Sequence, residues 1–574
     1  MERSGATGQL VTTDHIPSSR GRDAGSGASA AAPGTFSCVV DTHPLFHLNA
    51  LRWFASLTRS AGVDPRDLVV HVAGGPRTDV LEYLQAKGVT VREVPPFDAR
   101  SPPCNKIAAA LSLATQGRQG LCVLTDSDVA IFEDPRQIPA PAGKVGMKPV
   151  DLARPPLPIL ESVFAAAGLP PPRLVPLLGQ AGVATLAGNG NGGLYLVPGA
   201  MLPVVARAWE RWARWLLERR ELLAAWSLHV DQVAMALALA AEGIETFELD
   251  ARWNFPLHLP ALAGPDPAPP AVIHYHQQVD ATGQLSPAGI PALDRRIDEA
   301  NRAFGEVCRE AFPNATFWEW RYLTDPELGS GVGSRGEPLA DKRALLSVLL
   351  AALRPASVLD VGCGDGEATR GLPMPGYVGL DLSAAAVQRA RAGRPDGDHR
   401  VGTLADQPHA VQADLTVCLD VLIHQADAAG YHDLVSRLWR SAARALLISG
   451  YEHPFRATSP MIHFHEPLSA SLRRLDPDAA IHPLREVHGI TTWLVLKALP
   501  DRPADDPRDL PLAAVIELLK QRAERTERIG DLEAKVAACG AEIERWRQRV
   551  TAMEATRAWR WRAWLLRWRR GRGD

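Results

Sequence analysis

The sequence predicts an α/β protein with two successive α/β domains and a C-terminal helical coiled coil. Three observations lead to this prediction. A chain of 574 residues is too long for one hydrophobic core. Short apolar runs alternate with longer helical patterns in two separate blocks, as they do in βα units. Near the C-terminus, apolar residues recur in steps of three and four, which is the spacing of a coiled-coil seam.

The composition is that of a globular protein without a strong charge bias. Hydrophobic residues make up 46% of the chain, and 62 Lys and Arg against 65 Asp and Glu give a net charge of −3. This balance argues against a nucleic-acid partner. The seven cysteines are scattered and form no CxxC pair, so we expect free thiols in a reducing compartment. Because no apolar run of about 18 residues or more occurs, we expect a cytoplasmic protein without a spanning helix.

Changes in composition divide the chain into seven predicted segments. Ser, Gly and Ala dominate the N-terminus, which lacks the apolar core of a signal peptide, and closely spaced prolines mark a late linker. The segments are 1–35, a disordered leader; 36–280, the first α/β domain; 281–316, a helical bridge; 317–498, the second α/β domain; 499–512, a Pro-rich linker; 513–556, the coiled coil; and 557–574, a basic Arg/Trp tail.

The first α/β domain alternates apolar runs of strand length with helical patterns. Pro-rich stretches at Pro155–Pro176 and Pro260–Pro270 predict loops. The predicted strands are Phe36–Val40, Leu68–Val72, Val89–Val94 and Leu121–Leu124. The predicted helices are Leu45–Ser60 and Lys106–Thr115.

The C-terminal segments predict contacts with other molecules. The predicted seam residues of the coiled coil are Ile529, Leu532, Val536, Cys539, Ile543, Trp546, Val550 and Met553. This seam predicts a homo-oligomer, and the alternative is a helix packed on the chain's own domains. Seven Arg and four Trp between Arg557 and Arg572 favour peripheral contact with anionic lipid at the inner face of a membrane. The alternative for this tail is a solvated cationic end.

Three apolar runs in the second α/β domain each lead into a polar edge. The run Ser357–Gly366 reads SVLDVGCGDG, an apolar strand followed by a glycine-rich turn and a predicted helix from Glu367. The run Tyr377–Leu380 ends in Asp381, which is placed to accept both ribose hydroxyls of an adenosine cofactor. The third run is Leu415–Leu422.

VLDVGCGDG and YVGLDLS resemble the first and second motifs of class I S-adenosylmethionine-dependent methyltransferases, in the right order and spacing. The resemblance covers 317–497, including the glycine-rich segment Gly329–Gly336, which recurs upstream in some members. It implies a Rossmann-like fold with S-adenosylmethionine as cofactor. The residues that it assigns to the methionine part are Asp360, Gly362, Gly364 and Asp365. It further implies that Asp381 binds the ribose and Asp406 the adenine, and that Asp420 lies near the transferred methyl.

Methyl transfer itself requires little acid–base chemistry, because the sulfonium is already activated and in-line placement of the acceptor supplies much of the rate. A hydroxyl acceptor would benefit from a general base. His424, four residues after Asp420, is the candidate for this base. The other candidate histidines are His432, His463 and His465. Binding of a nicotinamide dinucleotide is the rival interpretation, but Glu367 stands where such folds usually keep a third glycine.

In the first domain, the run Leu121–Thr125 is followed by Asp126-Ser127-Asp128. Residues two apart on a strand point to the same side, so both carboxylates could bind one Mg²⁺ or Mn²⁺. Such an ion could neutralise a diphosphate leaving group. Further polar features of this domain are Lys106 at the start of a helix, the glycine-rich stretch Gly188–Gly193 before an apolar strand, Asp231-Gln232 at the start of another helix, and His274 at the end of a strand.

This set of motifs resembles that of GT-A-type glycosyltransferases and covers about 36–280. The resemblance implies a nucleotide-sugar donor and a divalent metal held by Asp126, Asp128 and His274. It implies that Asn191 and Asp231 contact the donor sugar or the acceptor, and that Lys106 binds the diphosphate. Instead of the G-x-K-P-W sequence of the retaining, glycogenin-like family, the chain has Gln277–Asp280. The stereochemical outcome therefore stays open, with Asp231 as a candidate base for an inverting reaction.

Together these features predict two nucleotide-binding-type domains, first GT-A-like and then Rossmann-like, in a bifunctional transferase of glycan biosynthesis. The expected acceptor is a glycan or a lipid-linked glycan, with the methyl group going to a sugar hydroxyl. One alternative is a methyltransferase whose N-terminal domain only binds a glycan or a nucleotide sugar. A second alternative is a membrane-edge scaffold with two degenerate domains. No basic patch accompanies the second domain, which argues against a nucleic-acid substrate.

Overall fold

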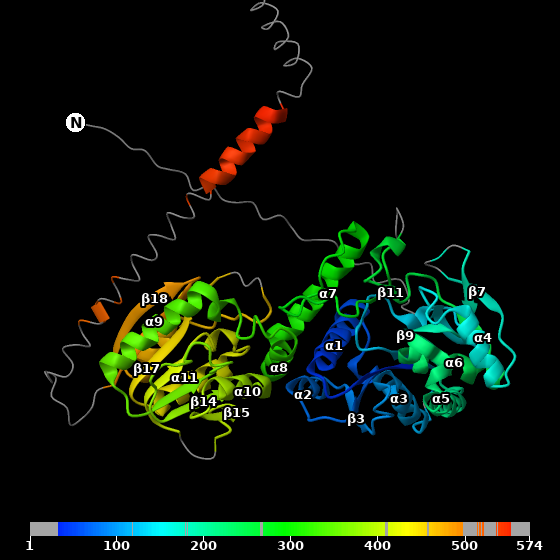
Figure 1. Ribbon diagram of the computed structural model, residues 1–574, viewed down its shortest axis with the longest axis horizontal. Helices are drawn as coiled ribbons and strands as arrows, with labels where there is room; N and C mark the ends of the chain where they lie inside the picture. Colours follow the sequence, from blue (N-terminus) through cyan, green and yellow to red (C-terminus); the bar gives the residue numbers. More distant parts are fainter. Residues whose placement is uncertain are drawn as a thin grey trace, which may run out of the picture.

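The computed structural model describes residues 33–117, 119–177, 180, 182–263, 268–407, 411–455, 459–497, 514, 516–517, 519, 521, 535 and 538–552. Two α/β domains lie side by side, with the helices α7 (Pro291–Glu310) and α8 (Asn314–Thr324) between them (Figure 1). The predicted linker, the Arg/Trp tail and nearly all of the predicted leader lie outside the described residues.

The N-terminal domain is built on a mixed seven-stranded sheet with the order β10-β6-β9-β4-β1-β2-β3. The strands are β1 (Gly34–Val40), β2 (Leu68–Ala73), β3 (Thr90–Val94), β4 (Leu121–Thr125), β6 (Val145–Pro149), β9 (Gly190–Pro198) and β10 (Thr246–Glu248). β1 to β4 run parallel to one another, whereas β9 runs antiparallel to both β4 and β6. The four strands predicted in this part of the sequence are therefore confirmed.

Alternation of side chains along these strands fills a hydrophobic core on each face of the sheet. Phe36 and Val70 point to one core, and Val69 points to the other. The helices that cover the faces are α1 (Pro44–Ala55), which continues as a π-helical turn over Ser56–Ser60, α2 (Asp79–Ala86), α3 (Asn105–Ala114), α4 (Leu157–Ala166), α5 (Leu202–Leu217) and α6 (Val230–Ala241). Two small sheets complete the domain, with the order β11-β12-β5 in one and β7 paired with β8 in the other. Their strands are β5 (Val129–Ile131), β7 (Leu174–Pro176), β8 (Ala184–Leu186), β11 (Phe255–Pro256) and β12 (Val272–His274).

Two local predictions for this domain are wrong. The stretch Pro155–Pro176 contains α4 and β7 and is not a plain loop, because Pro158 lies in the first turn of α4, where a missing N–H costs nothing. Gly190–Gly193 does not precede the strand but forms the first part of β9. A Cβ on Gly190 would lie 2.6 Å from Met147, and one on Gly193 would lie 2.5 Å from His274. Close packing therefore explains these glycines.

Among the described residues, one helical stretch, Arg220–Ala241, is long and apolar enough to span a membrane, with a mean hydropathy of 1.5. It joins a 3₁₀ segment to α6 and contains a backbone break at Ala224, where φ is 47°. α6 is buried against α5, and the indole of Trp209 donates a hydrogen bond of 2.7 Å to the carbonyl of Asp231. The stretch therefore has the environment of a core helix.

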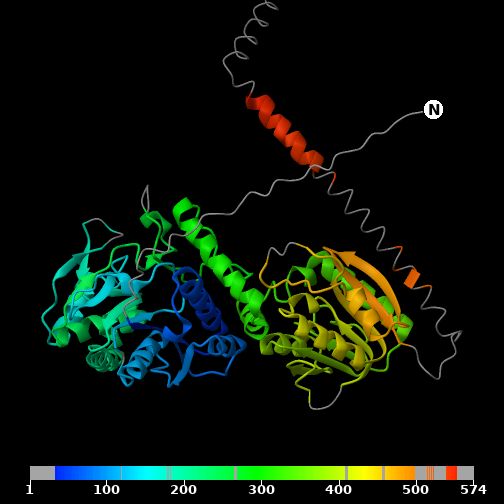
Figure 2. The same cartoon turned by 180° about the vertical axis from the view of Figure 1, so that it is seen from behind.

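The C-terminal domain has a second seven-stranded sheet, with the order β15-β14-β13-β16-β17-β19-β18. The strands are β13 (Val358–Val361), β14 (Tyr377–Asp381), β15 (Asp398–Val401), β16 (Ala413–Cys418), β17 (Ala442–Tyr451), β18 (Ala480–Val487) and β19 (Ile490–Leu496). The first five are parallel, and β19 runs antiparallel to its neighbours. The helices are α9 (Gly336–Leu353), α10 (Ala384–Gly393), α11 (Ala428–Ser441) and α12 (Leu468–Leu475), and Figure 2 shows this domain from behind. Chain order reverses between β13 and β16, where α/β sheets bind ligands.

The helix predicted from Glu367 is not formed. Turns connect β13 to β14, and Gly366 and Gly371 adopt φ of 75° and 70° there. Two prolines, Pro373 and Pro375, follow before β14 begins. Left-handed glycines and closely spaced prolines are incompatible with a continuous helix, so this prediction is corrected.

The coiled-coil prediction is corrected at its start. Ile516 and Leu519 are buried in the core of the C-terminal domain, so this part of the chain packs on its own domain. The described residues 538–552 form a helix, and three predicted seam residues on it, Ile543, Trp546 and Val550, are exposed. Their exposure is compatible with a coiled-coil seam, and oligomer formation stays a prediction.

Arg52 clamps the end of the N-terminal domain to α1. Its guanidinium is buried, donates hydrogen bonds to the Tyr275 hydroxyl at 3.1 Å and to the Gly283 carbonyl, and lies over the ring of Phe304. Removing this group would leave buried acceptors without partners.

We expect Arg52→Leu to lower the free energy of unfolding by about 3 kcal/mol, because two buried polar groups lose their donor. The matched control is Arg59→Leu, which removes an exposed arginine paired with Glu310 and should cost less than about 1 kcal/mol. Urea denaturation of the full chain measures both. Equal losses in the two variants would contradict the clamp.

Candidate functional site

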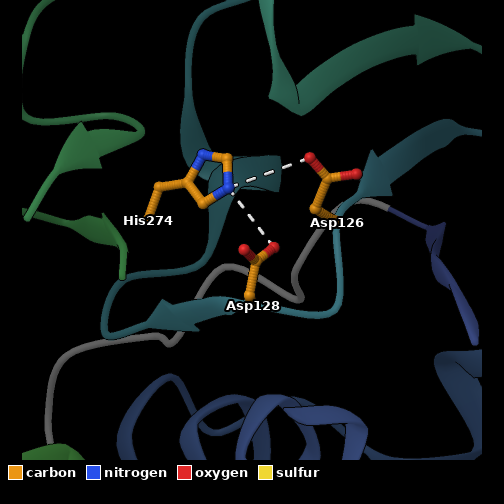
Figure 3. Close-up of side chains that lie close together, drawn as sticks. All are labelled: Asp126, Asp128 and His274. Carbon is orange, nitrogen blue, oxygen red and sulfur yellow. Dashed lines mark ion pairs between the residues drawn. The ribbon is translucent and has the colours of Figure 1, made fainter. Parts of the chain in front are cut away.

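Two aspartates and a histidine meet at one edge of the N-terminal sheet. Asp126 follows β4, Asp128 precedes β5, and His274 ends β12 (Figure 3). The His274 Nε2 atom lies 3.3 Å from Asp128 Oδ1 and 3.8 Å from Asp126 Oδ2. The three candidate ligand atoms lie within 4.8 Å of one another. The structure therefore brings together the three residues that the sequence predicts as metal ligands.

Strand pairing explains how residues so distant in sequence meet. β12 pairs antiparallel with β5, and His274 stands opposite Val129 in the ladder. The N–H of Tyr275 donates to the Asp128 carbonyl at 3.1 Å, which extends this pairing by one residue. The pairing thereby brings Asp128 and His274 together at the end of the ladder, where their side chains meet.

The cluster fits a divalent cation such as Mg²⁺ or Mn²⁺. Two carboxylate oxygens and one imidazole nitrogen are suitable donors for such an ion. Ligand atoms that share one ion with bonds of about 2.1 Å lie roughly 3 to 4 Å apart, which is the separation between His274 Nε2 and the two carboxylates. Burial acts against charging His274, yet the neighbouring Asp128 raises the pKa of this imidazole.

Lys106 links one further predicted residue, Asp231, to this cluster. Its ammonium lies 2.7 Å from Asp126 Oδ1 and 3.1 Å from Asp231 Oδ2. Burial alone would lower the pKa of Lys106, but these two carboxylates raise it well above its usual value. The result is a fixed positive charge beside the candidate metal ligands, where it could contact a phosphate.

Asn191 lies on the neighbouring strand β9 but is engaged in its own contacts. Its amide donates to Asp151 Oδ2 at 2.8 Å, and its side-chain oxygen accepts the N–H of Gly193 at 3.1 Å. Asn254, which the sequence analysis missed, has φ of 80° and donates from its amide to the Asn191 carbonyl at 3.2 Å. A buried asparagine with left-handed backbone is a signal that only the structure provides.

The C-terminal domain contains a cavity of about 860 Å³ at the carboxyl ends of β13, β14 and β16. This volume lies within the range of cofactor and small-molecule sites. The predicted residues that line it are Asp360, Gly362, Gly364, Asp365, Asp381, Asp420 and His424. The structure thus brings seven of the eight residues predicted for this domain to one cavity.

The first and second motifs interlock through backbone hydrogen bonds. The N–H of Gly364 donates to Asp381 Oδ2 and the N–H of Ser383 to Oδ1, both at 2.9 Å. Gly362 has φ of 75°, and a Cβ there would lie 2.2 Å from Val421. Only glycine therefore allows the loop after β13 to pass β16 and reach the cavity.

Two of the cavity carboxyl groups hold their protons more tightly than usual. Burial raises the pKa of Asp360 to about 6, against the opposing effect of the Tyr377 hydroxyl, which donates to it at 2.9 Å. Burial likewise raises the pKa of Asp381 to about 6, against its two backbone hydrogen bonds. Both groups therefore titrate in a range where ordinary carboxyls are fully ionised.

The glycine-rich segment Gly329–Gly336 folds onto the first motif, which follows it in the sequence. The Ser330 hydroxyl donates to Asp365 Oδ1 at 2.9 Å and lies 2.7 Å from the Tyr322 hydroxyl. Arg335 pairs with the other oxygen of Asp365. Asp365 is therefore saturated with protein partners and acts as the anchor of this segment.

Asp420 is half-buried and contacts two buried polar side chains, those of Lys342 and Ser449. Its backbone has φ of 60°, its Oδ2 pairs with the Lys342 ammonium at 2.6 Å, and its Oδ1 accepts the Ser449 hydroxyl at 2.9 Å. Residues in such rare conformations cluster at functional sites. Sequence reasoning missed Lys342 and Ser449, since both lie far from Asp420 in the sequence, on α9 and on β17, and meet it only in the fold.

His424 lines the cavity and has a defined tautomer. Its Nδ1 lies 2.7 Å from the Met461 carbonyl, which only accepts, so Nδ1 carries the proton and Nε2 has the free lone pair. Burial lowers the pKa of His424, which keeps the ring neutral at physiological pH. The alternative histidines do not line the cavity: His432, His463 and His465.

Asp406 is not placed as the resemblance implies. Its carboxylate accepts the N–H of Thr403 at 2.8 Å and the hydroxyl of the same residue at 2.7 Å. Gly402–Ala405 line the cavity, whereas Asp406 does not and stabilises that turn through its hydrogen bonds to Thr403. A local capping bond therefore explains this aspartate.

The raised pKa of Asp360 gives a pH-dependent stability with an unusual sign. Because the native state binds this proton more tightly than the unfolded chain, protonation stabilises the fold as pH falls from about 6 to about 4. Above about pH 6, the neutral substitution Asp360→Asn should be more stable than the wild type by up to about 3 kcal/mol. The gap should close below about pH 4. Urea denaturation across this range measures it, and a pH-independent gap would contradict the assignment.

Comparisons with known proteins agree with the C-terminal geometry. Residues 359–451 match the family model described as a methyltransferase domain. The comparison with curated proteins gives no match. Similar solved structures include magnesium protoporphyrin IX methyltransferase from Synechocystis PCC 6803 with bound SAH, at 20% identity and a TM-score of 0.26, covering 34% of this chain and 99% of that one.

Two further similar structures are methyltransferases. N-methyltransferase NodS from Bradyrhizobium japonicum WM9, in complex with S-adenosyl-L-homocysteine, is 14% identical, covers 32% of this chain and 100% of its own, and has a TM-score of 0.27. CalS10, an amino pentose methyltransferase from Micromonospora echinaspora, is 16% identical, covers 29% and 94%, and has a TM-score of 0.24. The strand order and the cavity described above agree with the family model. The chain therefore contains a class I S-adenosylmethionine-dependent methyltransferase domain with a Rossmann-like fold.

Proposed function

We propose that this chain is a bifunctional transferase of glycan biosynthesis. Its C-terminal domain would move the methyl group of S-adenosylmethionine to a sugar hydroxyl, and its N-terminal domain would transfer a sugar from a nucleotide-sugar donor. The observation that carries the second activity is the meeting of Asp126, Asp128 and His274 beside Lys106. The acceptor would be a glycan or a lipid-linked glycan.

In the methyltransferase domain, different cavity residues would contribute to cofactor binding in different ways. When bound, S-adenosylmethionine supplies an activated methyl group. Asp381 offers two carboxylate oxygens at the tip of β14, where ribose hydroxyls can donate to them. Gly362 and Gly364, which line the cavity, carry no side chains, so a cofactor could approach the backbone closely at these two positions. Lys342 compensates the charge of Asp420, which lowers the cost of placing this carboxylate in the cavity wall.

His424 favours a hydroxyl as the methyl acceptor. A hydroxyl must lose its proton during transfer, and a neutral imidazole with a fixed tautomer is suited to receive it. The hydrogen bond to the Met461 carbonyl fixes Nδ1 as the protonated nitrogen, so Nε2 is the atom that would take the proton. Its lowered pKa keeps the ring neutral and available as a base.

In the N-terminal domain, we propose a GT-A-type arrangement. The two aspartates and His274 would hold one Mg²⁺ or Mn²⁺, which neutralises charge on a diphosphate leaving group. Lys106 would contact the same diphosphate once a donor competes with Asp126 for its ammonium. Asp231, buried and paired with Lys106, is the candidate base, and Asn191 is the candidate contact to donor or acceptor.

The C-terminal segment would organise several copies of the enzyme. We propose that the helix over 538–552 joins a homo-oligomeric coiled coil, since three of its seam residues are large, apolar and exposed: Ile543, Trp546 and Val550. The basic Arg/Trp tail that follows would hold a cytoplasmic enzyme at the inner face of a membrane, close to lipid-linked acceptors.

We expect Asp381→Asn to weaken S-adenosylmethionine binding about tenfold, because an amide has one acceptor oxygen for two ribose hydroxyls. Wild-type affinity should also fall as pH drops through about 6, where Asp381 gains a proton. Isothermal titration calorimetry measures both effects. The matched control is Asp406→Asn, outside the cavity, which should bind as the wild type does; the reverse order of the two variants would refute the assignment of the ribose site.

For sugar transfer, we expect the full chain to release a nucleoside diphosphate from one member of a panel of nucleotide sugars. Release should require Mn²⁺ or Mg²⁺ and stop with EDTA. Asp128→Asn should lower the rate at least about a hundredfold, since it removes a charged ligand, while the exposed carboxyl variant Asp64→Asn should leave it unchanged. No release from any donor, with or without a glycan acceptor, would instead favour a non-catalytic binding domain.

A further inference from the structure

Helix α8 belongs to both domains at once. Phe317 and Trp320 are buried in the core of the N-terminal domain, where α8 packs against α1. On its other side, Trp318, Arg321 and Tyr322 line the cavity of the methyltransferase domain. One rigid helix therefore forms part of a core in the first domain and part of a wall in the second.

The N-terminus of α8 is capped by the other domain. Pro313 at the N-cap position supplies no side-chain acceptor, although the first N–H groups of a helix need one. Asp79, in the first turn of α2, accepts the N–H of Ala315 at 2.9 Å through Oδ2 and the hydroxyl of Thr316 through Oδ1. Asp79 of the N-terminal domain therefore supplies the carboxylate that caps α8. The same residue also lines the cavity.

α8 in turn caps a helix of the methyltransferase domain. Glu319 Oε2 accepts the Ser383 hydroxyl at 2.6 Å and the N–H of Ala385 at 3.1 Å, at the start of α10. The N–H of Ser383 also donates to Asp381 at 2.9 Å. A continuous series of hydrogen bonds and one helix therefore connects Asp79 to the carboxylate at the tip of β14.

We propose that α8 makes the N-terminal domain an integral part of the S-adenosylmethionine site, with Asp79 and Glu319 as positioning residues that act on Asp381. Through α8, Asp79 sets the position of the cavity wall that carries Trp318. Through Glu319, the same helix holds the turn between β14 and α10. This inference rests on cofactor binding by the methyltransferase domain and is independent of sugar transfer.

The test measures binding of S-adenosylmethionine to the full chain by calorimetry. Asp79→Ala should weaken binding about tenfold, because α8 loses its capping acceptor. Asp79→Asn should restore binding to within about twofold of the wild type, since its amide oxygen still accepts the Ala315 N–H. Glu319→Ala should weaken binding similarly, and the double alanine variant should show less than the product of the two effects, as expected for residues on one connection.

The control is Asp64→Ala, which removes another capping carboxylate of the same domain, one that accepts the N–H of Arg66 far from α8. It should bind as the wild type does, and circular dichroism should show all variants folded. Wild-type affinity in Asp79→Ala, equal weakening in Asp79→Asn, or equal weakening in Asp64→Ala would each overturn the inference. Absence of binding by the wild type would instead refute cofactor binding itself.

Discussion

Carboxyl groups placed below the protein surface are the constraint on which both sites depend. An ionised carboxylate loses much of its hydration there, so hydrogen-bonding or charged protein groups must stabilise its charge instead. The N-terminal cluster uses a lysine and a histidine for this purpose, with Lys106 against Asp126 and His274 against Asp128. The methyltransferase cavity uses backbone N–H groups at Asp381. The balance between burial and these partners determines the pH at which each carboxyl group titrates, near pH 6 for Asp360 and Asp381.

The strand ends bring these carboxyl groups together, and this part of the architecture is readable from sequence. An apolar run followed by a polar residue marks a strand and its carboxyl end, as at Leu121–Thr125 before Asp126. Since parallel strands present these ends at one edge, the local pattern predicts a shared site. Six of the predicted methyltransferase positions gather in this way at β13, β14 and β16, and His424 follows one turn later.

Features that depend on distant contacts escaped the sequence analysis. Lys342 meets Asp420 only because α9 packs beside the end of β16, and nothing local to either residue indicates the pair. The helix expected from Glu367 does not form, because the glycines and prolines that follow adopt turns instead. Asp406 has the expected position in the sequence, yet its carboxylate accepts a hydrogen bond within its own turn. Periodicity and motif spacing carry no information on such competition.

Left-handed backbone at Asp420 has a consequence for how this site can change during evolution. A φ of 60° is tolerated by glycine, asparagine and aspartate and strongly disfavours β-branched or bulky residues. The backbone conformation alone therefore restricts which residues can replace Asp420. Drift at this position would pass mainly through asparagine, a change that preserves the turn while it removes the carboxylate that pairs with Lys342. A relative with asparagine here should carry a compensating loss of the lysine.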